Sequence, residues 1–311
     1  MLNQSHNSVE STRQAIQKNL DARKSPAERN RLGQFATPNS LAVEIAAYLA
    51  TLLRDEKFAV RFAEPSLGTG SFYSAILSVL GPGRMASSLG IEIDPEVCQA
   101  ASELWSEYGL RVICGDFTRV VANGPRLPRP NVILANPPYV RHHHFDREEK
   151  IRLQALAHEM AGIDVNGLAG LYVYFLILAT AWMENDGYAA WLIPSEFMDV
   201  NYGRALKSYL ADQLTLIRVH RFNPDDVQFG DALVSSAVLV FRKCTPRPDH
   251  AVEFTFGGTF HKPKASDLIP LPELRRARKW TVYPRHHGND RCISADRDAP
   301  TLADFFKIRR G

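Results

Sequence analysis

The chain has 311 residues, and 45% of them are hydrophobic, so it can bury a large core in one big domain or two smaller ones. A net charge of +3 and a sequence pI of about 8.6 permit nucleic-acid binding without demanding it. The longest apolar stretch, 168–183, is too short for a membrane span, and the four cysteines lack Cys-x-x-Cys spacing. We therefore expect a globular cytoplasmic protein and exclude membrane, disulfide-framework and zinc-module classes.

The first segment, residues 1–30, is polar and charged, with a helical pattern over 9–24 and little apolar face. It predicts a polar, flexible helical arm ahead of the main domain. Pro38 then stands at the first turn of a helix expected over 40–53, since proline is well tolerated there. We expect that helix to pack across the opening of a sheet.

Short apolar runs alternate with helical patterns in the middle of the chain. Strands are predicted near 59–63, 88–93, 110–114 and 131–135, with helices near 71–80 and 95–107. This alternation is typical of βαβ units, in which helices join parallel strands. Later helices are predicted near 147–160, 168–184 and 202–210, and later strands near 188–193, 214–220 and 234–242. We predict a Rossmann-like α/β fold with a mostly parallel seven-stranded sheet and a C-terminal antiparallel hairpin.

A glycine turn follows the first of these strands. Glu64 and Pro65 end the strand, and Gly68 and Gly70 let the backbone approach a ligand closely. A dinucleotide fingerprint would need a third glycine, but positions 71–73 are Ser-Phe-Tyr. Pyrophosphate binding is therefore disfavoured, and a nicotinamide enzyme is the least favoured class.

Acidic residues end the next two strands. Glu92, followed by Ile93, lies about twenty residues beyond the glycine turn, where a doubly wound fold binds a pair of ribose hydroxyls. Asp116 ends the following strand and is suited to accept a hydrogen bond from an adenine amino group, with Phe117 packed near the ring. Ligands of open α/β sheets collect at the carboxyl ends of strands, so these residues and Glu64 predict one cleft.

The sequence Asn136-Pro137-Pro138-Tyr139 comes directly after the apolar run 132–135, at the end of a buried strand. An amino nitrogen on a base or carboxamide is a poor nucleophile because its lone pair is delocalised. The side-chain oxygen of Asn136 can take one N–H and the carbonyl of Pro137 the other, which aims the lone pair at a methyl donor. The prolines bring no competing donor, and Tyr139 offers a flat face to a base rotated out of a duplex. The pattern predicts methyl transfer to a planar amino nitrogen.

Together these motifs resemble those of the S-adenosylmethionine-dependent DNA methyltransferases that act on exocyclic amino groups, in particular the adenine-N6 enzymes of the γ motif order from restriction-modification systems. The resemblance follows the family's segment order: Gly33 to Pro38, Glu64 to Phe72, Glu92, Asp116, Asn136 to Tyr139 and Leu192 to Phe197. It covers residues 31–243 and implies that they form a catalytic domain.

The resemblance also implies roles for single residues. The expected contacts of S-adenosylmethionine are Thr37, Pro38, Glu64, Pro65, Gly68, Gly70, Glu92, Ile93, Asp116, Phe117 and Asn136. Thr37 lies near its methionine end. The expected catalytic residues are Asn136, Pro137, Pro138 and Tyr139. Phe229 lies where the family places an aromatic side chain, so Tyr139 and Phe229 are expected to sandwich the flipped adenine.

The implied activity is site-specific methylation of adenine N6 in double-stranded DNA, in a restriction-modification or phage-defence system. A specificity or restriction subunit is an expected partner, and no metal is expected. Cytosine-N4 methylation is a near alternative. A protein glutamine methyltransferase is a second class, because a side-chain amide presents similar hydrogens, and a non-catalytic cofactor-binding subunit is a third.

The last segment, 244–311, is rich in prolines and charges. It predicts a linker. The resemblance further implies that 301–311 is the opening strand of a target-recognition domain, so sequence specificity would lie outside these residues. The basic run 275–279 within it indicates either contact with the DNA backbone or an exposed linker.

Two other groups of side chains have competing interpretations. Arg141 and the three histidines 142–144 are by default a solvated mobile loop, with a phosphate or base contact by Arg141 as the alternative, and adjacent histidines rarely share one metal. Tyr172, Tyr174 and Phe175 are expected in a helix core rather than in a stacking platform.

Overall fold

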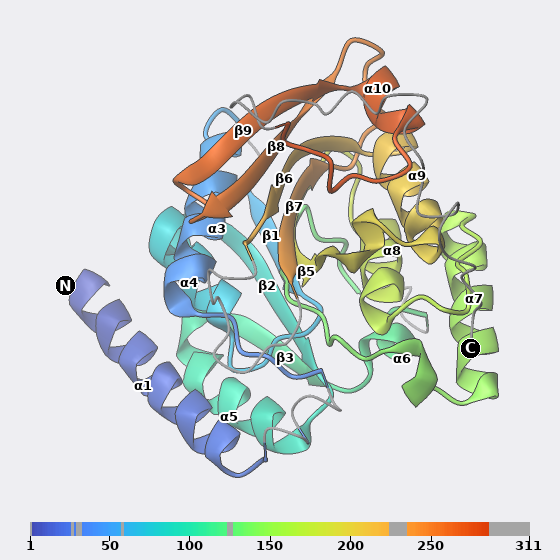
Figure 1. Ribbon diagram of the computed structural model, residues 1–311. Helices are drawn as coiled ribbons and strands as arrows, with labels where there is room; N and C mark the ends of the chain where they lie inside the picture. The colour runs from blue at the N-terminus through green and yellow to red at the C-terminus, as the bar shows by residue number, and fades with distance from the viewer. Residues whose placement is uncertain are drawn as a thin grey trace, which may run out of the picture.

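A single large sheet dominates the computed structural model, which describes residues 2–25, 28, 33–56, 59–122, 127–223 and 235–285. Its strands are β1 (Val60–Glu64), β2 (Met85–Glu92), β3 (Leu110–Cys114), β4 (Val132–Ala135), β5 (Tyr188–Pro194), β6 (Thr215–Arg221), β7 (Ser236–Arg242), β8 (Ala251–Gly258) and β9 (Pro263–Pro270). They lie in the order β3-β2-β1-β4-β5-β7-β6-β8-β9 (Figure 1). Strands β1 to β5 run parallel, and β7 pairs antiparallel with both β5 and β6. The predicted fold class is confirmed.

The sheet has nine strands among the described residues rather than the seven predicted. Strand β8 pairs parallel with β6, and β9 pairs antiparallel with β8. Both lie where a linker was expected, so that expectation was wrong for 251–270. Of the prolines that suggested a linker, Pro270 ends β9, where an edge strand tolerates it, and Pro272 stands in the first turn of α10. The domain boundaries themselves remain predictions.

Helices cover both faces of the sheet (Figure 1). They are α1 (Leu2–Ala22), α3 (Asn39–Leu52), α4 (Ser71–Leu80), α5 (Pro95–Trp105), α6 (Phe117–Ala122), α7 (Arg147–Ala161), α8 (Leu171–Trp182), α9 (Arg204–Asp212) and α10 (Leu271–Arg276). Short 3-10 turns are η1 (Pro82–Arg84), η2 (Ser106–Tyr108), η3 (His142–His144), η4 (Ser195–Met198) and η5 (Asn201–Gly203).

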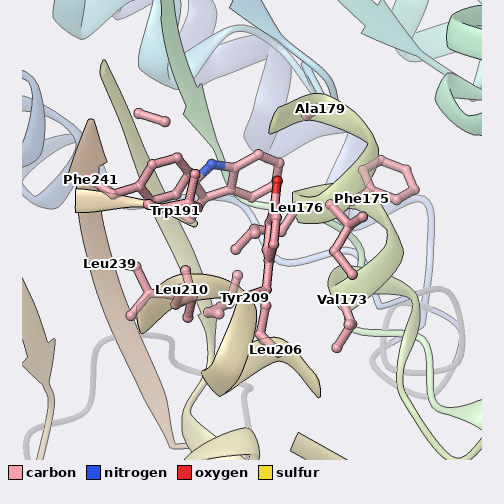
Figure 2. Close-up of a cluster of buried hydrophobic side chains, with 14 of the residues drawn as sticks. Val173, Phe175, Leu176, Ala179, Trp191, Leu206, Tyr209, Leu210, Leu239 and Phe241 are labelled. Carbon is pink, nitrogen blue, oxygen red and sulfur yellow. The ribbon is translucent and has the colours of Figure 1, made fainter. Parts of the chain in front are cut away.

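Two apolar cores form because successive side chains of a strand point to opposite faces. On β4, Val132 and Leu134 join the core under α3, α4 and α5, whereas Ile133 and Ala135 join the core under α6 to α10. In the second core, Trp191 of β5 lies between helices α8 and α9 and is fully buried (Figure 2). Strands β4 and β5 are thereby buried on both faces, as their unbroken apolar sequences require.

Helix α8 contains the longest apolar stretch of the chain. Its Tyr172, Tyr174 and Phe175 are all buried, in agreement with the expected core role. Within the described ranges, no helix combines the length and the apolar character needed to cross a membrane.

Local capping fixes the helix starts that face the carboxyl edge of the sheet. Asp94 caps α5 by accepting from the backbone N–H groups of Glu96 and Val97, with Pro95 in the first turn. Asp146 caps α7 in the same way through Glu149 N. Such caps satisfy donors that the helix cannot, and each contributes about 1 kcal/mol.

Candidate functional site

The parallel strands β3, β2, β1 and β4 are neighbours in the sheet, and their carboxyl ends meet at one edge. The predicted site residues Glu64 and Glu92 are the last residues of β1 and β2, Asp116 follows β3, and Asn136 follows β4. The structure therefore places these four side chains along one edge, as four consecutive strand ends. That four segments far apart in the sequence meet at one edge follows directly from the parallel pairing of the strands.

The glycine turn between β1 and α4 is held by its neighbours. Gly70 has a φ of 86° and precedes α4, and a Cβ there would lie 2.5 Å from Trp105 Nε1. That indole nitrogen donates to the carbonyl of Thr69 at 2.8 Å. Gly68 also has a positive φ, of 54°, but a Cβ there would meet no atom within 4 Å. The turn thus has one glycine packed against protein and one facing open space.

Glu64 lies behind the turn and is almost fully buried, as is Pro65. Its Oε2 accepts from the backbone N–H of Tyr73 at 3.1 Å. Burial raises the pKa of this carboxyl well above its usual value, although the N–H groups of Tyr73 and Phe72 and the nearby Arg13 oppose the rise. Glu64 therefore holds the first turn of α4 and lies close to the glycine turn.

Glu92 is fixed in a similar way at the end of β2. Its Oε2 accepts from Gly68 N at 2.8 Å and its Oε1 from Asp94 N at 2.9 Å. Burial raises the pKa of Glu92 despite these two bonds. A carboxylate oxygen has two lone pairs, so each oxygen keeps capacity to accept from a hydroxyl. Ile93 beside it is 64% exposed, an apolar surface at the same edge.

Asp116 and Phe117 have tighter surroundings than the sequence suggested. Oδ1 of Asp116 accepts from the backbone N–H and the hydroxyl of Thr118, at 2.8 and 2.9 Å, and so caps α6. Its Oδ2 lies 3.4 Å from Arg119 Nε. The ring of Phe117 is buried against Phe175, with 4.9 Å between centroids. Their contacts with a cofactor adenine remain predictions.

The amide of Asn136 is the most constrained group of the site. Its Nδ2 donates to the carbonyl of Phe35 at 2.8 Å and to Thr37 Oγ1 at 3.1 Å. Both N–H groups are therefore used, which fixes the orientation of the amide plane. The Oδ1 atom is buried and has no hydrogen-bond partner among the described residues. A buried acceptor without a partner costs about 1–3 kcal/mol, which a ligand N–H would recover.

The backbone of this loop is fixed from behind by the segment 33–38. Gly33 has a φ of 63°, and a Cβ there would lie 2.4 Å from Tyr139 N. That N–H donates to the carbonyl of Gly33 at 3.1 Å, and Ser66 Oγ donates to the carbonyl of Asn136 at 2.8 Å. The segment 33–38 and the glycine turn after β1 thus both hold the backbone of the loop from Asn136 to Tyr139.

Tyr139 is buried rather than open to solvent. Its ring lies 5.5 Å from that of Phe35, and its hydroxyl donates to the carbonyl of Leu192 at 3.3 Å. Burial raises the pKa of this phenol, with a hydrogen bond to Ser236 opposing the rise. The hydroxyl is accordingly neutral and serves to anchor the ring. Pro137 is buried and Pro138 half-buried beside it.

A set of polar residues on α1 belongs to the site and was missed in the sequence. Arg13 is 3% exposed and forms a two-pronged pair with Glu10, at 2.8 Å for both bonds. Its third nitrogen donates to Thr69 Oγ1 at 2.9 Å and to Ser71 Oγ at 2.8 Å, on either side of Gly70. Helix α1 is thus docked on the glycine turn, beside α4 and α5 (Figure 1), although a flexible arm was expected.

The sequence does contain a pattern that relates to this docking, a set of polar residues at helical spacing on α1. Glu10, Arg13, Gln14 and Gln17 recur at helical spacing, so they form one stripe of α1. Gln17 accepts from the hydroxyl of Thr69 at 2.8 Å. A polar stripe is usually solvated, and only the contacts with Thr69 and Ser71 show that Glu10 and Arg13 of this stripe are buried.

Other predicted residues lie elsewhere. Phe229 and the segment 301–311 are outside the described residues. Arg141 is exposed and precedes the turn of histidines η3. The described residues contain no group of three or more His, Cys, Asp or Glu side chains placed to hold a metal.

Comparisons with known proteins agree with the motifs. The family model of the Eco57I restriction-modification methylase matches residues 131–228. The Type II methyltransferase M.XamI of Xanthomonas campestris pv. amaranthicola is 25% identical over 288 residues, which are 90% of this chain and 51% of the relative. This chain therefore spans about half the length of that protein.

Solved structures share the fold. A putative class I S-adenosylmethionine-dependent methyltransferase from Listeria monocytogenes has a TM-score of 0.59 at 14% identity, covering 86% of this chain and 80% of that one. DrdV, in its complex with DNA, has a TM-score of 0.60 at 16% identity, covering 83% of this chain and 32% of that one. The fold is that of the S-adenosylmethionine-dependent methyltransferases.

These findings confirm the resemblance to restriction-modification DNA methyltransferases. They also agree with S-adenosylmethionine as the cofactor expected from the motifs. The comparisons do not specify which base is methylated or what each site residue does.

Proposed function

We propose that this chain is the catalytic part of a site-specific DNA methyltransferase that moves a methyl group from S-adenosylmethionine to adenine N6 in duplex DNA. One observation carries the proposal: the buried Oδ1 of Asn136 has no partner among the described residues, while both N–H groups of the same amide are held. An acceptor fixed in this way pairs with a donor such as an N–H group, and it does not pair with another acceptor such as a phosphate oxygen.

The cofactor site is proposed along the ends of β1, β2 and β3. Open space over Gly68 leaves room for a ligand beside the turn, and Glu92 keeps acceptor capacity for a ribose hydroxyl pair. The exposed side chain of Ile93 offers apolar contact for an adenine ring. These features fit S-adenosylmethionine, which would supply an electrophilic methyl group. Thr37, Pro38 and the turn from Glu64 to Gly70 are the proposed contacts for the rest of the molecule.

The residues of this chain prepare the amine rather than activate it with a base. Asn136 Oδ1 and the Pro137 carbonyl accept the two N–H bonds of the target amine, so its lone pair points toward the methyl donor. Phe35 and Thr37 act through Asn136, because they hold its amide in the orientation that presents Oδ1. The substrate proton is lost after methylation, when the nitrogen is strongly acidic, so no group of raised basicity is needed at Asn136.

The target base is proposed to leave the duplex before it reacts. An amino group inside the helix cannot reach a buried atom such as Asn136 Oδ1, so the base must rotate out, at a cost of a few kcal/mol. Tyr139, anchored by its hydroxyl, and Phe229 are the proposed walls of its pocket. Support for DNA as substrate comes from the Type II methyltransferase relative and from the neighbour solved with DNA.

The partners and setting follow from the same proposal. Duplex DNA is the substrate, in a restriction-modification or phage-defence system. The relative M.XamI extends well beyond the matched region. Base recognition is therefore assigned to residues or a specificity subunit outside the described part. The described cysteines Cys98, Cys114 and Cys244 are free thiols, which suits a reducing cytoplasm.

Identification of the methylated product tests the proposal. The chain is incubated with S-adenosylmethionine carrying a labelled methyl group and with unmethylated duplex DNA, and the product nucleosides are separated. Labelled N6-methyl-2′-deoxyadenosine is expected. Label in N4-methylcytosine would move the activity to the alternative base, which the same amide geometry serves. Label in a protein glutamine and none in DNA would overturn the proposed substrate.

A further inference from the structure

A basic pocket lies on the side of the molecule where α10 packs beside α9 (Figure 1). It has a volume of about 330 Å³, within the range of sites that hold small ligands. The charged side chains that line it are Arg204, Lys207, Arg275, Arg276, Arg278 and Asp212. Five cations therefore face one carboxylate, and the pocket is separate from the edge that carries Asn136 and Glu92.

The basic run 275–279 is held against the domain, so it is not a solvated linker. Trp280 N donates to the carbonyl of Met198 at 3.0 Å, and the Trp280 ring is buried. Lys207 Nζ donates to that same Met198 carbonyl at 3.1 Å and also to the carbonyl of Arg278. Side chains that project from this segment are accordingly presented by a fixed backbone, which lowers the entropy that a ligand must overcome.

Most of the positive charge in the pocket is not neutralised within the domain. Arg275 pairs with Asp212 at 2.7 Å, which uses the one carboxylate of the lining. Arg204, Arg276 and Arg278 are exposed, and no carboxylate of the described residues forms an ion pair with them. Guanidinium groups held together without counter-charges repel one another, and an anion that binds between them removes that repulsion. The arrangement is complementary to an anionic ligand.

We propose that this pocket binds phosphodiester groups of the DNA backbone and so positions the duplex on the catalytic domain. The inference rests on the proposed function, in which duplex DNA is the substrate. The planar fork of Arg276 and Arg278 matches two phosphate oxygens at once, which a lysine cannot do. Contacts of this kind position a protein without reading sequence, so they fit a catalytic part that depends on recognition elsewhere.

The place of the pocket in the fold supports DNA over a small effector. Val200, Asn201 and Arg204 belong to its lining and follow the carboxyl end of β5 at Pro194. Strand β5 pairs with β4, whose end carries Asn136. A duplex that delivers a base to Asn136 therefore runs over strand ends that lead to this pocket. Arg141, a further exposed cation, lies close enough to Tyr202 of η5 to oppose the rise in its pKa.

The salt dependence of DNA binding tests the proposal on the full chain. The dissociation constant of a short labelled duplex is measured over a range of salt concentrations for the wild type, for R276Q/R278Q and for the control R54Q/R111Q. Arg54 and Arg111 are also exposed arginines but lie near the amino ends of β1 and β3, opposite the proposed DNA edge. The double variants make the same change in charge, and S-adenosylmethionine affinity verifies the fold of each.

Loss of two phosphate contacts should reduce the slope of log Kd against log salt by about two and weaken binding roughly 30-fold at ~0.15 M salt. The control should retain the wild-type slope. Equal losses in both double variants would overturn the pocket and leave only a general charge effect. If R276Q/R278Q instead loses binding of polyglutamate and keeps that of the duplex, the pocket serves an acidic protein segment. The proposed function fails separately, if methyl transfer does not depend on Asn136 whatever the slope.

Discussion

Replacement of Arg13 by methionine should break the contacts of α1 with Thr69 and Ser71 of the glycine turn. The substitution removes four hydrogen bonds, two to Glu10 and one each to Thr69 and Ser71, but keeps most of the side-chain volume. It leaves the Glu10 carboxylate buried without its counter-charge. Removal of one partner from a buried ion pair typically costs about 3–5 kcal/mol, and Arg13 is 3% exposed, so no discount for solvent applies. We expect a loss of unfolding free energy in that range, or undocking of α1 if the helix detaches first.

The assay measures urea unfolding and S-adenosylmethionine affinity side by side. Because Arg13 holds Thr69 and Ser71 around Gly70, R13M should weaken cofactor binding by tenfold or more, about 1.4 kcal/mol. R13K keeps the charge but not the fork and should recover part of both effects. K18M, on the exposed side of α1, is the matched control. The reasoning is refuted if R13M and K18M change stability and affinity to the same extent.

The same pair gives a pH dependence with a definite sign. Burial alone would raise the pKa of Glu10, but hydrogen bonds from Arg13, Ser74 and Gln14 outweigh it, so its pKa lies below the usual 4.5. A carboxyl with a depressed pKa stabilises the folded state above its unfolded pKa and loses that contribution as the pH falls through the folded value. The stability difference between wild type and R13M should therefore shrink below about pH 4.5.

Three further predictions follow from the geometry of the site. Gly68→Ala places a methyl group in the space assigned to the cofactor, so it should weaken S-adenosylmethionine binding. Gly109 has a similar positive φ and open surroundings, so the control Gly109→Ala should lower stability without changing that affinity. Equal affinities of the two variants would contradict the cofactor placement. Glu64→Gln keeps an acceptor for Tyr73 N but removes a buried charge of raised pKa. Its thermal stability should therefore exceed that of wild type by a margin that grows as the pH rises above the usual carboxyl pKa of 4.5, and a constant margin would be evidence against the raised pKa. Gly33→Ala should abolish methyl transfer, because its Cβ would lie 2.4 Å from Tyr139 N, and a variant with normal turnover would show that the loop position is not critical.

The catalytic edge could be predicted because its signals are local in sequence. Each of Glu64, Glu92 and Asn136 follows an apolar run long enough for a buried strand, and parallel pairing then places all three at one edge. The amide chemistry of Asn136 was likewise readable from residue types. Its supporting contacts with Phe35 and Thr37 span about a hundred positions of sequence and could not be derived from spacing.

The parts that were missed depend on contacts between distant segments. Strand β9 alternates exposed and half-buried positions in a stretch of prolines and charges, so its composition indicated a linker. Arg13 sits in a polar stripe that looks solvated until Thr69 and Ser71 are placed against it. The expected burial of Tyr172 shows the opposite case, in which a continuous apolar run is sufficient to identify a core helix.

Single-turnover methyl transfer by Asn136→Ala, at saturating S-adenosylmethionine and with cofactor affinity measured separately, tests the central claim most directly. The account predicts a loss of transfer on the order of 10²-fold or more, because an acceptor that acts in the transition state is removed, with cofactor affinity changed only slightly. Transfer at the wild-type rate would contradict the role assigned to the Asn136 oxygen. A loss of transfer that only follows a loss of cofactor binding would contradict it as well.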